Sequence, residues 1–278
     1  MLPDMNAVYR LAELALSEDV GAGDVTTNSI VPPDLSAAAL IVAREEGVVA
    51  GLFVAEAVFR LLDGGVSFSS RVREGGQFKE GQVLAEVCGK ARAILTGERT
   101  ALNFLQRLCG IATFTRRLVR LLDGYPARLV DTRKTTPGLR LLEKYAVRAG
   151  GGGNHRFGLY DAVLIKDNHL KVAGSIARAV QLARASVPLT MKIEVETENL
   201  TQVEEALAAG ADIIMLDNME PEDMRKAVSL VAGRALLEAS GGINEKNILA
   251  VARSGVDFIS AGALTHSAPA LDISLEII

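Results

Sequence analysis

Charged residues follow several short apolar stretches in the second half of the chain, and they form two sets of opposite sign. The basic set comprises Arg133, Lys134, Arg156 and Lys166. Arginine can bind a carboxylate or a phosphate through two parallel hydrogen bonds, so cations gathered at one place predict an anionic ligand. Glu196 and Asp217 form the acidic set, which suits a metal ion or a cationic transition state. Internal salt bridges between the two sets are the alternative interpretation.

Glycines stand next to these charges at three places. Ser240, Gly241 and Gly242 precede a predicted helix, and Gly262 follows the last predicted strand. Such loops let backbone N–H groups approach an anion, which predicts a phosphate site built from the late loops of a barrel. A run of four glycines at 150–153 lies directly before Asn154-His155-Arg156. It allows a loop near the basic set to bend sharply or to move, although a flexible linker would look the same.

The segment around Glu196 alternates in polarity. Lys192, Glu194 and Glu196 share one face of an extended chain, while Ile193 and Val195 share the other. In a barrel the apolar face packs on helices, so the charged face points inward, where it needs a partner or a ligand. A solvated edge strand is the other possibility. The three histidines, His155, His169 and His266, show no metal-binding spacing, and each is either a site residue or a structural histidine.

Elements that position these residues can be read from periodicity. Short apolar strands are predicted at 128–131, 162–165, 189–195, 212–216, 235–239 and 257–261. Helices are predicted between them, for example over 200–209, from Pro221 onward, and over 244–254 with Asn244 as the cap. Alternating strands and helices indicate a parallel sheet whose carboxyl ends form the active face. Six units are fewer than the eight of a complete barrel, so we expect an incomplete α/β barrel.

The first part of the chain has a different texture. A short amphipathic helix is predicted over 11–20, followed by β-like segments at 39–43, 47–51, 66–70 and 83–87 with a helix over 53–62 between them. A long helix or a bent pair follows over 96–122, with Gly110 as the expected break. We therefore expect an N-terminal α/β sandwich domain at 1–112 and an α/β-barrel domain at 113–267, with 268–278 returning to the first domain.

Composition excludes several classes of protein. The chain has 278 residues, of which 49% are hydrophobic, so it is not a disordered protein. Its net charge of −4 argues against a nucleic-acid partner. Cys88 and Cys109 have no zinc-site spacing, and no segment is typical of a secretion signal or a membrane span. We expect a cytoplasmic protein with no membrane partner. The glycines at 76–81 are not followed by the lysine of a phosphate-binding P-loop.

Motifs along nearly the whole chain resemble those of one enzyme family. They are GERTALN at 97–103, DTRKTTPG at 131–138, KY at 144–145, NHR at 154–156, KDNH at 166–169, EVE at 194–196, LDN at 216–218, EASGG at 238–242 and ALTH at 263–266. In this order they resemble quinolinate phosphoribosyltransferase, the carboxylating nicotinate-nucleotide pyrophosphorylase. The resemblance implies a pentosyltransferase of NAD biosynthesis, which converts quinolinate and phosphoribosyl pyrophosphate into nicotinate mononucleotide, pyrophosphate and carbon dioxide with Mg²⁺.

The resemblance also implies roles for individual residues. The quinolinate carboxylates would be held by Arg133, His155, Arg156 and Lys166, with Arg99 donated by the partner subunit of a homodimer or of a hexamer built as a trimer of dimers. Lys134, Glu196 and Asp217 would be the catalytic residues that meet phosphoribosyl pyrophosphate, and Glu196 and Asp217 would bind its Mg²⁺. The 5-phosphate would be held by Ser240, Gly241, Gly242, Gly262 and His266.

Two kinds of alternative stay open at this point. A transferase of the same fold with another acceptor, either ModD-like or specific for nicotinate, would keep the architecture. The basic residues Arg133, Arg156 and Lys166 favour an acceptor with two carboxylates. A non-catalytic binding module would leave Lys134, Glu196 and Asp217 without a purpose.

Overall fold

The computed structural model describes residues 2–278, which divide into two compact units. Of the described residues, the first unit contains those up to Arg116, Thr135–Gly151 and Ser267–Ile278, and the second contains Arg117–Lys134 and Gly152–His266. The expected boundary at 112/113 lies close to the first division. The segment 135–151, which the sequence analysis placed in the barrel domain, belongs to the first unit.

An antiparallel sheet forms the centre of the first unit. Its strand order is β12-β1-β5-β3, with bounds β1 (Ser36–Ala43), β3 (Ser67–Ser70), β5 (Val83–Lys90) and β12 (Ile273–Ile277). Ala39 lies opposite Val87 on one side and Ile277 on the other. The strand nearest the end of the chain therefore pairs with the first strand. A small second sheet pairs β2 (Gly47–Val48) with β4 (Gln77–Phe78).

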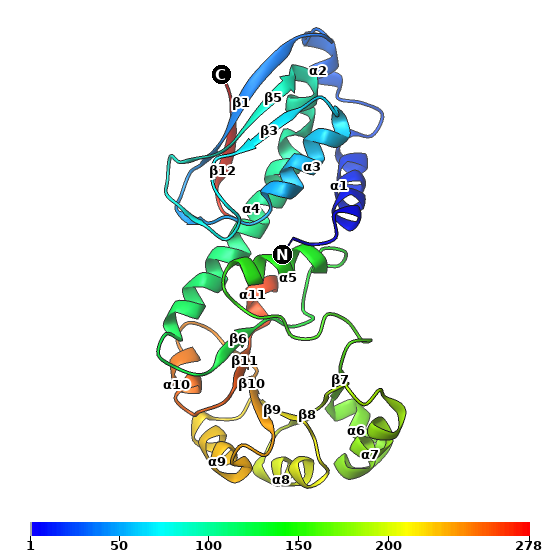
Figure 1. Cartoon of the computed structure of the whole chain (residues 1–278), viewed down its shortest axis with the longest axis vertical. Coiled ribbons are helices and arrows are strands. Elements are labelled where there is room, and N and C mark those ends of the chain that lie inside the picture. The colour runs from blue at the N-terminus through cyan, green and yellow to red at the C-terminus, as the bar shows by residue number, and fades with distance from the viewer. Residues whose placement is uncertain (1) are drawn as a thin grey trace. The chain divides into compact units, whose positions relative to one another are not determined.

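Helices cover one face of this sheet (Figure 1). They are α1 (Met5–Val20), α3 (Leu52–Leu62) and α4 (Ala91–Leu121), and the unit also contains α2 (Val25–Ile30) and α5 (Arg140–Ala149). Ile41, Phe59 and Leu102 from the sheet and two helices are fully or almost fully buried in one apolar core. Burial of such side chains is the main favourable term in folding. The expected strand at 47–51 ends early because Glu74 accepts hydrogen bonds from the backbone N–H groups of Gly51 and Leu52, which start α3.

Gly110 does not break the long helix, contrary to the sequence-based expectation. α4 runs without interruption through it from Ala91 to Leu121. A Cβ atom on Gly110 would lie 1.9 Å from the carbonyl oxygen of Pro269. The glycine is therefore explained by close approach of another backbone segment rather than by a bend of the helix.

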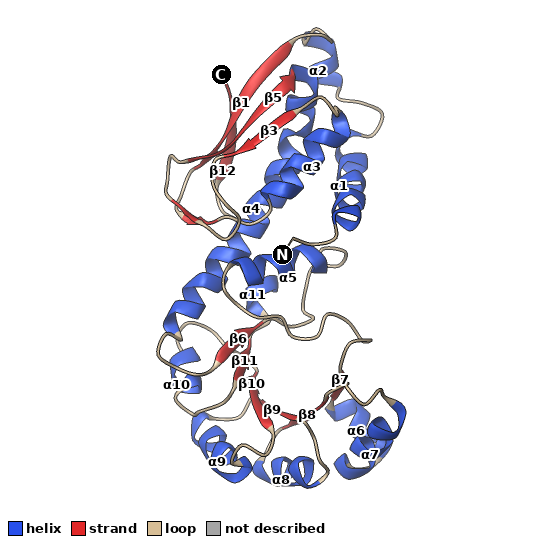
Figure 2. Cartoon of the chain, in the orientation of Figure 1, coloured by secondary structure: helices blue, strands red, loops and turns tan. Residues whose placement is uncertain are grey.

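The second unit contains a six-stranded parallel sheet in the order β6-β11-β10-β9-β8-β7. The strands are β6 (Arg128–Val130), β7 (Val163–Ile165), β8 (Ile193–Thr197), β9 (Ile213–Asp217), β10 (Leu236–Ser240) and β11 (Phe258–Ser260). The helices are α6 (Asp167–Ala173), α7 (Ile176–Ser186), α8 (Leu200–Ala208), α9 (Pro221–Val231), α10 (Ile248–Ala252) and α11 (Ala263–His266). Figure 2 shows the strands on a curve with helices α6 to α10 on its outer side. β6 and β7 are the edges, so the expected incomplete α/β barrel is confirmed.

Local signals explain most helix starts in this unit. The side chains of Ser175 and Asn199 cap α7 and α8, and Pro221 occupies the first turn of α9. Two boundaries differ from expectation. β8 begins at Ile193 rather than at residue 189, since Leu189 is 98% exposed. The residue directly before α10 is Asn247 rather than Asn244.

None of the helices in residues 2–278 has the length and apolar content that crossing a membrane requires.

Candidate active site

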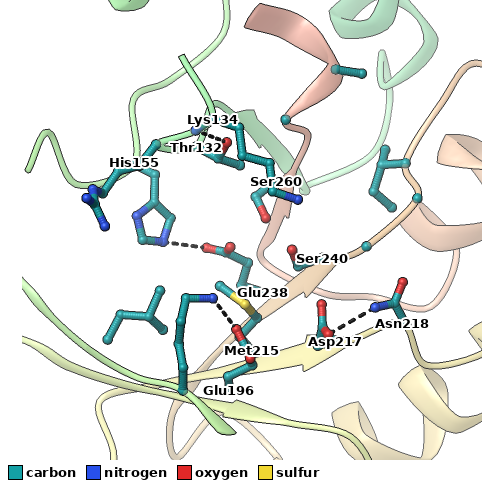
Figure 3. A pocket seen from close by; sticks show the side chains of 18 of the residues that line it. Thr132, Lys134, His155, Glu196, Met215, Asp217, Asn218, Glu238, Ser240 and Ser260 are labelled. Carbon is teal, nitrogen blue, oxygen red and sulfur yellow. Dashed lines mark hydrogen bonds and ion pairs between the residues drawn. The ribbon is translucent and has the colours of Figure 1, made fainter. Parts of the chain in front are cut away.

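A cavity of about 780 Å³ opens at the carboxyl ends of the parallel strands (Figure 3). Its lining comes from all six strand ends and the loops that follow them. Twelve of the residues singled out in the sequence line it: Arg133, Lys134, His155, Arg156, Lys166, Glu196, Asp217, Ser240, Gly241, Gly242, Gly262 and His266. Arg99 does not, and its side chain is exposed on α4. The structure therefore brings together residues that lie up to 133 positions apart in the sequence.

Two guanidinium groups face the cavity close to one another. Arg156 donates a hydrogen bond from Nη1 to the carbonyl oxygen of Ala162 at 3.2 Å. Burial and the positive charge of Arg133 lower the pKa of Arg156, and they outweigh the opposite effects of Glu194 and Asp161. Like charges held together at a cavity wall favour an anionic ligand, because binding relieves the repulsion.

Two carboxylates lie on neighbouring strands at the same cavity. Glu196, on β8, forms an ion pair with Nζ of Lys166. Asp217 ends β9 and accepts a hydrogen bond of 2.9 Å from Nδ2 of Asn218. The donor set consists of two hard oxygen ligands, which fits Mg²⁺, because this ion is commonly bound by one or two carboxylates and by substrate phosphates.

The loop after β10 approaches Asn218 very closely. Gly241 has φ +99°, and a Cβ atom there would lie 2.2 Å from Oδ1 of Asn218. Gly242 also has positive φ, and its carbonyl oxygen accepts hydrogen bonds from the side chains of Asn244 and Asn247. Asn218 itself has φ +53°, and its backbone N–H donates to the carbonyl of Ser240. Sequence and hydrogen bonding thus fix a tight loop whose backbone faces the cavity.

A third glycine provides room for two functional side chains. A Cβ atom on Gly262 would lie 2.9 Å from Cδ of Lys134 and 3.2 Å from the ring of His266. The backbone of Lys134 is held on both sides, since its N–H donates to Oγ1 of Thr132 and its carbonyl accepts from Oγ1 of Thr265. Lys134 is therefore positioned by its own backbone and by the absence of a side chain at Gly262.

His155 lies between two buried glutamates in the same cavity. Its Nε2 is 3.0 Å from Oε2 of Glu194 and 3.2 Å from Oε2 of Glu238. Its Nδ1 accepts a hydrogen bond of 2.7 Å from the backbone N–H of Arg156. Figure 3 shows the imidazole pointing toward Glu238. Glu194 and Glu238 are only 2% and 3% exposed. We call His155, Glu194 and Glu238 the histidine–glutamate cluster.

Burial and hydrogen bonding both act on the protons of His155 and Glu194 in the histidine–glutamate cluster. Burial disfavours the charged imidazole, whereas the carboxylates of Glu194 and Glu238 favour a proton at Nε2. Burial also raises the pKa of Glu194. The bound proton lies on the Nε2 side of the ring, because Nδ1 faces the N–H of Arg156.

Several polar residues that line the cavity received no individual role from the sequence. Asn218, Glu238, Thr132 and Ser260 all face it. Each lies within two residues of the end of a predicted strand, so position near a strand end was the available signal. Lys192, by contrast, precedes β8 and lines a separate pocket with Asp212.

Comparison with known proteins agrees with this architecture. The chain matches the model of the quinolinate phosphoribosyl transferase N-terminal domain over residues 24–109 and that of the C-terminal domain over residues 111–276. It is 50% identical over 260 residues to a probable carboxylating nicotinate-nucleotide pyrophosphorylase of Bacillus subtilis, covering 94% of this chain and 90% of that one. A protein of the same description from Methanocaldococcus jannaschii is 44% identical, with 97% and 96% covered.

A solved structure gives the same result at the level of the backbone. The nicotinate-nucleotide pyrophosphorylase of Francisella tularensis superimposes with a TM-score of 0.92 at 43% identity, covering 98% of this chain and 96% of that one. Both domain models and relatives of nearly equal length therefore match in sequence, and the fold matches throughout. The chain belongs to the quinolinate phosphoribosyltransferase family.

Proposed function

We propose that this protein transfers the phosphoribosyl group of phosphoribosyl pyrophosphate to quinolinate and releases pyrophosphate and carbon dioxide, giving nicotinate mononucleotide for NAD biosynthesis. The observation that carries the proposal is the cavity itself. It combines the repelling pair Arg133 and Arg156 with two carboxylates and a glycine loop, in a chain of this family. A dicarboxylate acceptor needs the pair of arginines. A phosphorylated sugar donor needs the glycine loop for its phosphate and the two carboxylates for its metal ion.

Quinolinate binds at the basic end of the cavity in this proposal. Arg133, Arg156 and Lys166 contact its two carboxylates, and His155 lies beside them. Arginine pairs with carboxylates through two hydrogen bonds and fixes the plane of the acceptor ring. That orientation presents the pyridine nitrogen to the sugar carbon that it attacks.

Phosphoribosyl pyrophosphate binds beside it. Ser240, Gly241, Gly242, Gly262 and His266 hold the 5-phosphate, and Lys134 contacts the pyrophosphate. Glu196 and Asp217 would hold Mg²⁺. When bound, this ion offsets negative charge on the leaving pyrophosphate.

The residues act by position and charge. The pyridine nitrogen forms a bond to C1 of the ribose while the C1–O bond breaks and its electron pair leaves with pyrophosphate. Positive charge grows on the sugar, and the carboxylates of Glu196 and Asp217 stabilise it. The nitrogen is then quaternary, so the ring accepts the electron pair that carbon dioxide leaves behind at C2, and a proton from water completes the product. No general base is required for the loss of carbon dioxide.

We place the protein in the cytoplasm, as an assembly of at least two copies. Cys88 and Cys109 are both free thiols, as a reducing compartment favours. Arg99 is exposed and is not among the cavity residues, so in this proposal it reaches the cavity of a second copy. Mixing inactive Arg99→Ala and Lys134→Ala proteins tests this, because a hybrid assembly would contain one intact site. Recovered activity is expected, and its absence after subunit exchange would refute the shared site.

The proposed reaction is tested with purified protein, phosphoribosyl pyrophosphate and Mg²⁺. Quinolinate and nicotinate are compared as acceptors, and both nicotinate mononucleotide and carbon dioxide are measured. We expect equal amounts of the two products from quinolinate and little product from nicotinate. Turnover of nicotinate at a similar rate, or of neither acceptor, would refute the proposed acceptor.

A further inference from the structure

The histidine–glutamate cluster raises the question of what His155 does in the cavity. Both of its ring nitrogens are engaged inside the protein, Nε2 with two carboxylates and Nδ1 with a backbone N–H. A neutral imidazole has one donor and one acceptor nitrogen. Since Nδ1 accepts the hydrogen bond from Arg156, the donor is Nε2. In this arrangement neither nitrogen is available to a substrate carboxylate.

A metal ion is the other ligand that these three groups could take. One imidazole and two carboxylates within 4.8 Å of one another are a set typical of a transition-metal site. A metal would need the lone pair of Nε2, and Nδ1 would then carry the proton and act as a donor. The N–H of Arg156 points at Nδ1, which is therefore an acceptor. The geometry thus favours a proton at Nε2 over a metal ion.

The loop that carries His155 is held from a second side. Asp131 is fully buried at the end of β6. Its carboxylate accepts a hydrogen bond of 2.9 Å from the backbone N–H of His155 and one of 2.6 Å from Nδ2 of Asn154. Backbone and ring of His155 are therefore fixed independently. What the ring adds is a fixed acceptor for the next residue in the chain, Arg156.

We propose that Glu194 and Glu238 are positioning residues for the acceptor site, acting through His155 on Arg156. The two glutamates accept the proton of Nε2–H and so fix the orientation of the ring. Nδ1 of the ring then accepts the hydrogen bond from the backbone N–H of Arg156 and fixes that residue. As a result the guanidinium of Arg156 points toward the bound quinolinate. This inference rests on the proposed function, because it assigns Arg156 to a carboxylate of quinolinate. It gives His155 a role that involves no hydrogen bond to the substrate.

Two substitutions of His155 distinguish positioning from direct binding. Asparagine can place its amide oxygen near the position of Nδ1, so His155→Asn keeps an acceptor for the N–H of Arg156. Glutamine reaches the position of Nε2 instead, so His155→Gln keeps a group facing the glutamates but loses that acceptor. We expect His155→Asn to retain at least about tenfold more kcat/KM for quinolinate than His155→Gln, the effect of leaving one buried N–H without its acceptor. The reverse order would overturn the proposal.

The glutamates are tested in the same assay. Glu194→Ala and Glu238→Ala should each raise KM for quinolinate about 10- to 100-fold, with KM for phosphoribosyl pyrophosphate changed less than about threefold. Glutamine at either position keeps an acceptor oxygen for Nε2–H and should restore most of the lost affinity. The matched control is Glu198→Ala, an exposed glutamate just after the same strand that does not line the cavity. Equal rises in both KM values, or no rescue by glutamine, would indicate a structural role only.

One measurement is independent of activity. The chain has only three histidines, so nitrogen NMR can assign each ring, with His155→Asn identifying the signal of His155. The expected signature is a ring protonated at Nε2 and not at Nδ1. A proton on Nδ1, or metal retained in equimolar amount after purification, would overturn the inference. If the wild type does not use quinolinate, the proposed function fails while this measurement still tests the contacts.

Discussion

Replacing Gly241 by alanine tests whether the loop after β10 is as tightly fitted as the structure indicates. The added Cβ would lie 2.2 Å from Oδ1 and 2.9 Å from the backbone nitrogen of Asn218. The side chain of Asn218 could rotate away, but its backbone cannot. Overpacking of this kind costs about 1–3 kcal/mol, and the backbone conformation at φ +99° adds about 1–3 kcal/mol for a residue with a side chain.

Gly242→Ala is the matched control. Gly242 has φ +60° with no heavy atom within 4 Å of a Cβ, so only the backbone cost of about 1–2 kcal/mol applies. At about 2–4 °C per kcal/mol, Gly241→Ala should lower Tm by about 4–24 °C and Gly242→Ala by about 2–8 °C. Thermal unfolding followed by circular dichroism measures both.

Activity gives a second readout of the same contact. Asn218 donates to Asp217, so a displaced Asn218 also displaces a carboxylate of the site. A shift of about 1 Å can cost about 100-fold in rate, and we expect kcat/KM of the folded Gly241→Ala protein to fall by at least that factor. If Gly241→Ala melts no lower than Gly242→Ala, the steric argument is refuted.

Three further changes probe the charges and the thiols. Arg156→Ala should lower kcat/KM for quinolinate at least about 100-fold, because two charge-assisted hydrogen bonds to the substrate are lost. The Tm of this variant should stay equal or rise, because the repulsion between Arg156 and Arg133 is relieved. A large fall in Tm would contradict this. Removal of divalent cations by a chelator should abolish turnover, and added Mg²⁺ should restore it. In a titration of rate against Mg²⁺, Asp217→Asn should raise the concentration needed for half-maximal activation at least about tenfold. An unchanged titration curve would show that Asp217 does not bind the metal ion. Burial raises the pKa of Cys109 to about 12, so a chromogenic disulfide reagent at pH 8 should count no more than one thiol, Cys88, in the folded protein and two in denaturant. Because the unfolded thiol ionises first, the free energy of unfolding should fall by about 1.4 kcal/mol per unit above about pH 9, and Cys109→Ala should lack this contribution.

Local pattern was sufficient to predict much of the barrel unit. The strand expected at 212–216 is β9 (Ile213–Asp217), and the one expected at 235–239 is β10 (Leu236–Ser240). Apolar runs of this length between helical segments have few other solutions, and polar residues at their ends mark the active face. Glu194 and Glu196 share a face because strand periodicity is two, as the sequence indicated.

Contacts that depend on the order of strands were not predictable. Glu194 and Glu238 lie on β8 and β10, which are separated in the sheet by β9, and they meet only because His155 reaches both. Neither the spacing of 44 residues nor the residue types reveal this. The same holds for Asn218, whose positive φ arises where β9 and the loop after β10 meet.

Gly110 shows a related limit. A glycine within a helical pattern predicts a break from local propensity alone, at a cost of about 1 kcal/mol relative to alanine. Its actual reason is the carbonyl of Pro269, 159 residues further along the chain. A prediction made from the residues near Gly110 in the sequence does not include Pro269, so it could not find this contact.

Pairing of β12 with β1 has a consequence for synthesis on the ribosome. The backbone N–H of Ile278 donates to the carbonyl of Ala38, and Ile273 lies opposite Ala43. Translation therefore delivers β1 more than 200 residues before its edge partner, and the whole barrel emerges in the interval. Until then β1 has only one neighbour in its sheet, and its other edge is open to other strands. The first unit is therefore completed only after residues 273–277 have left the ribosome.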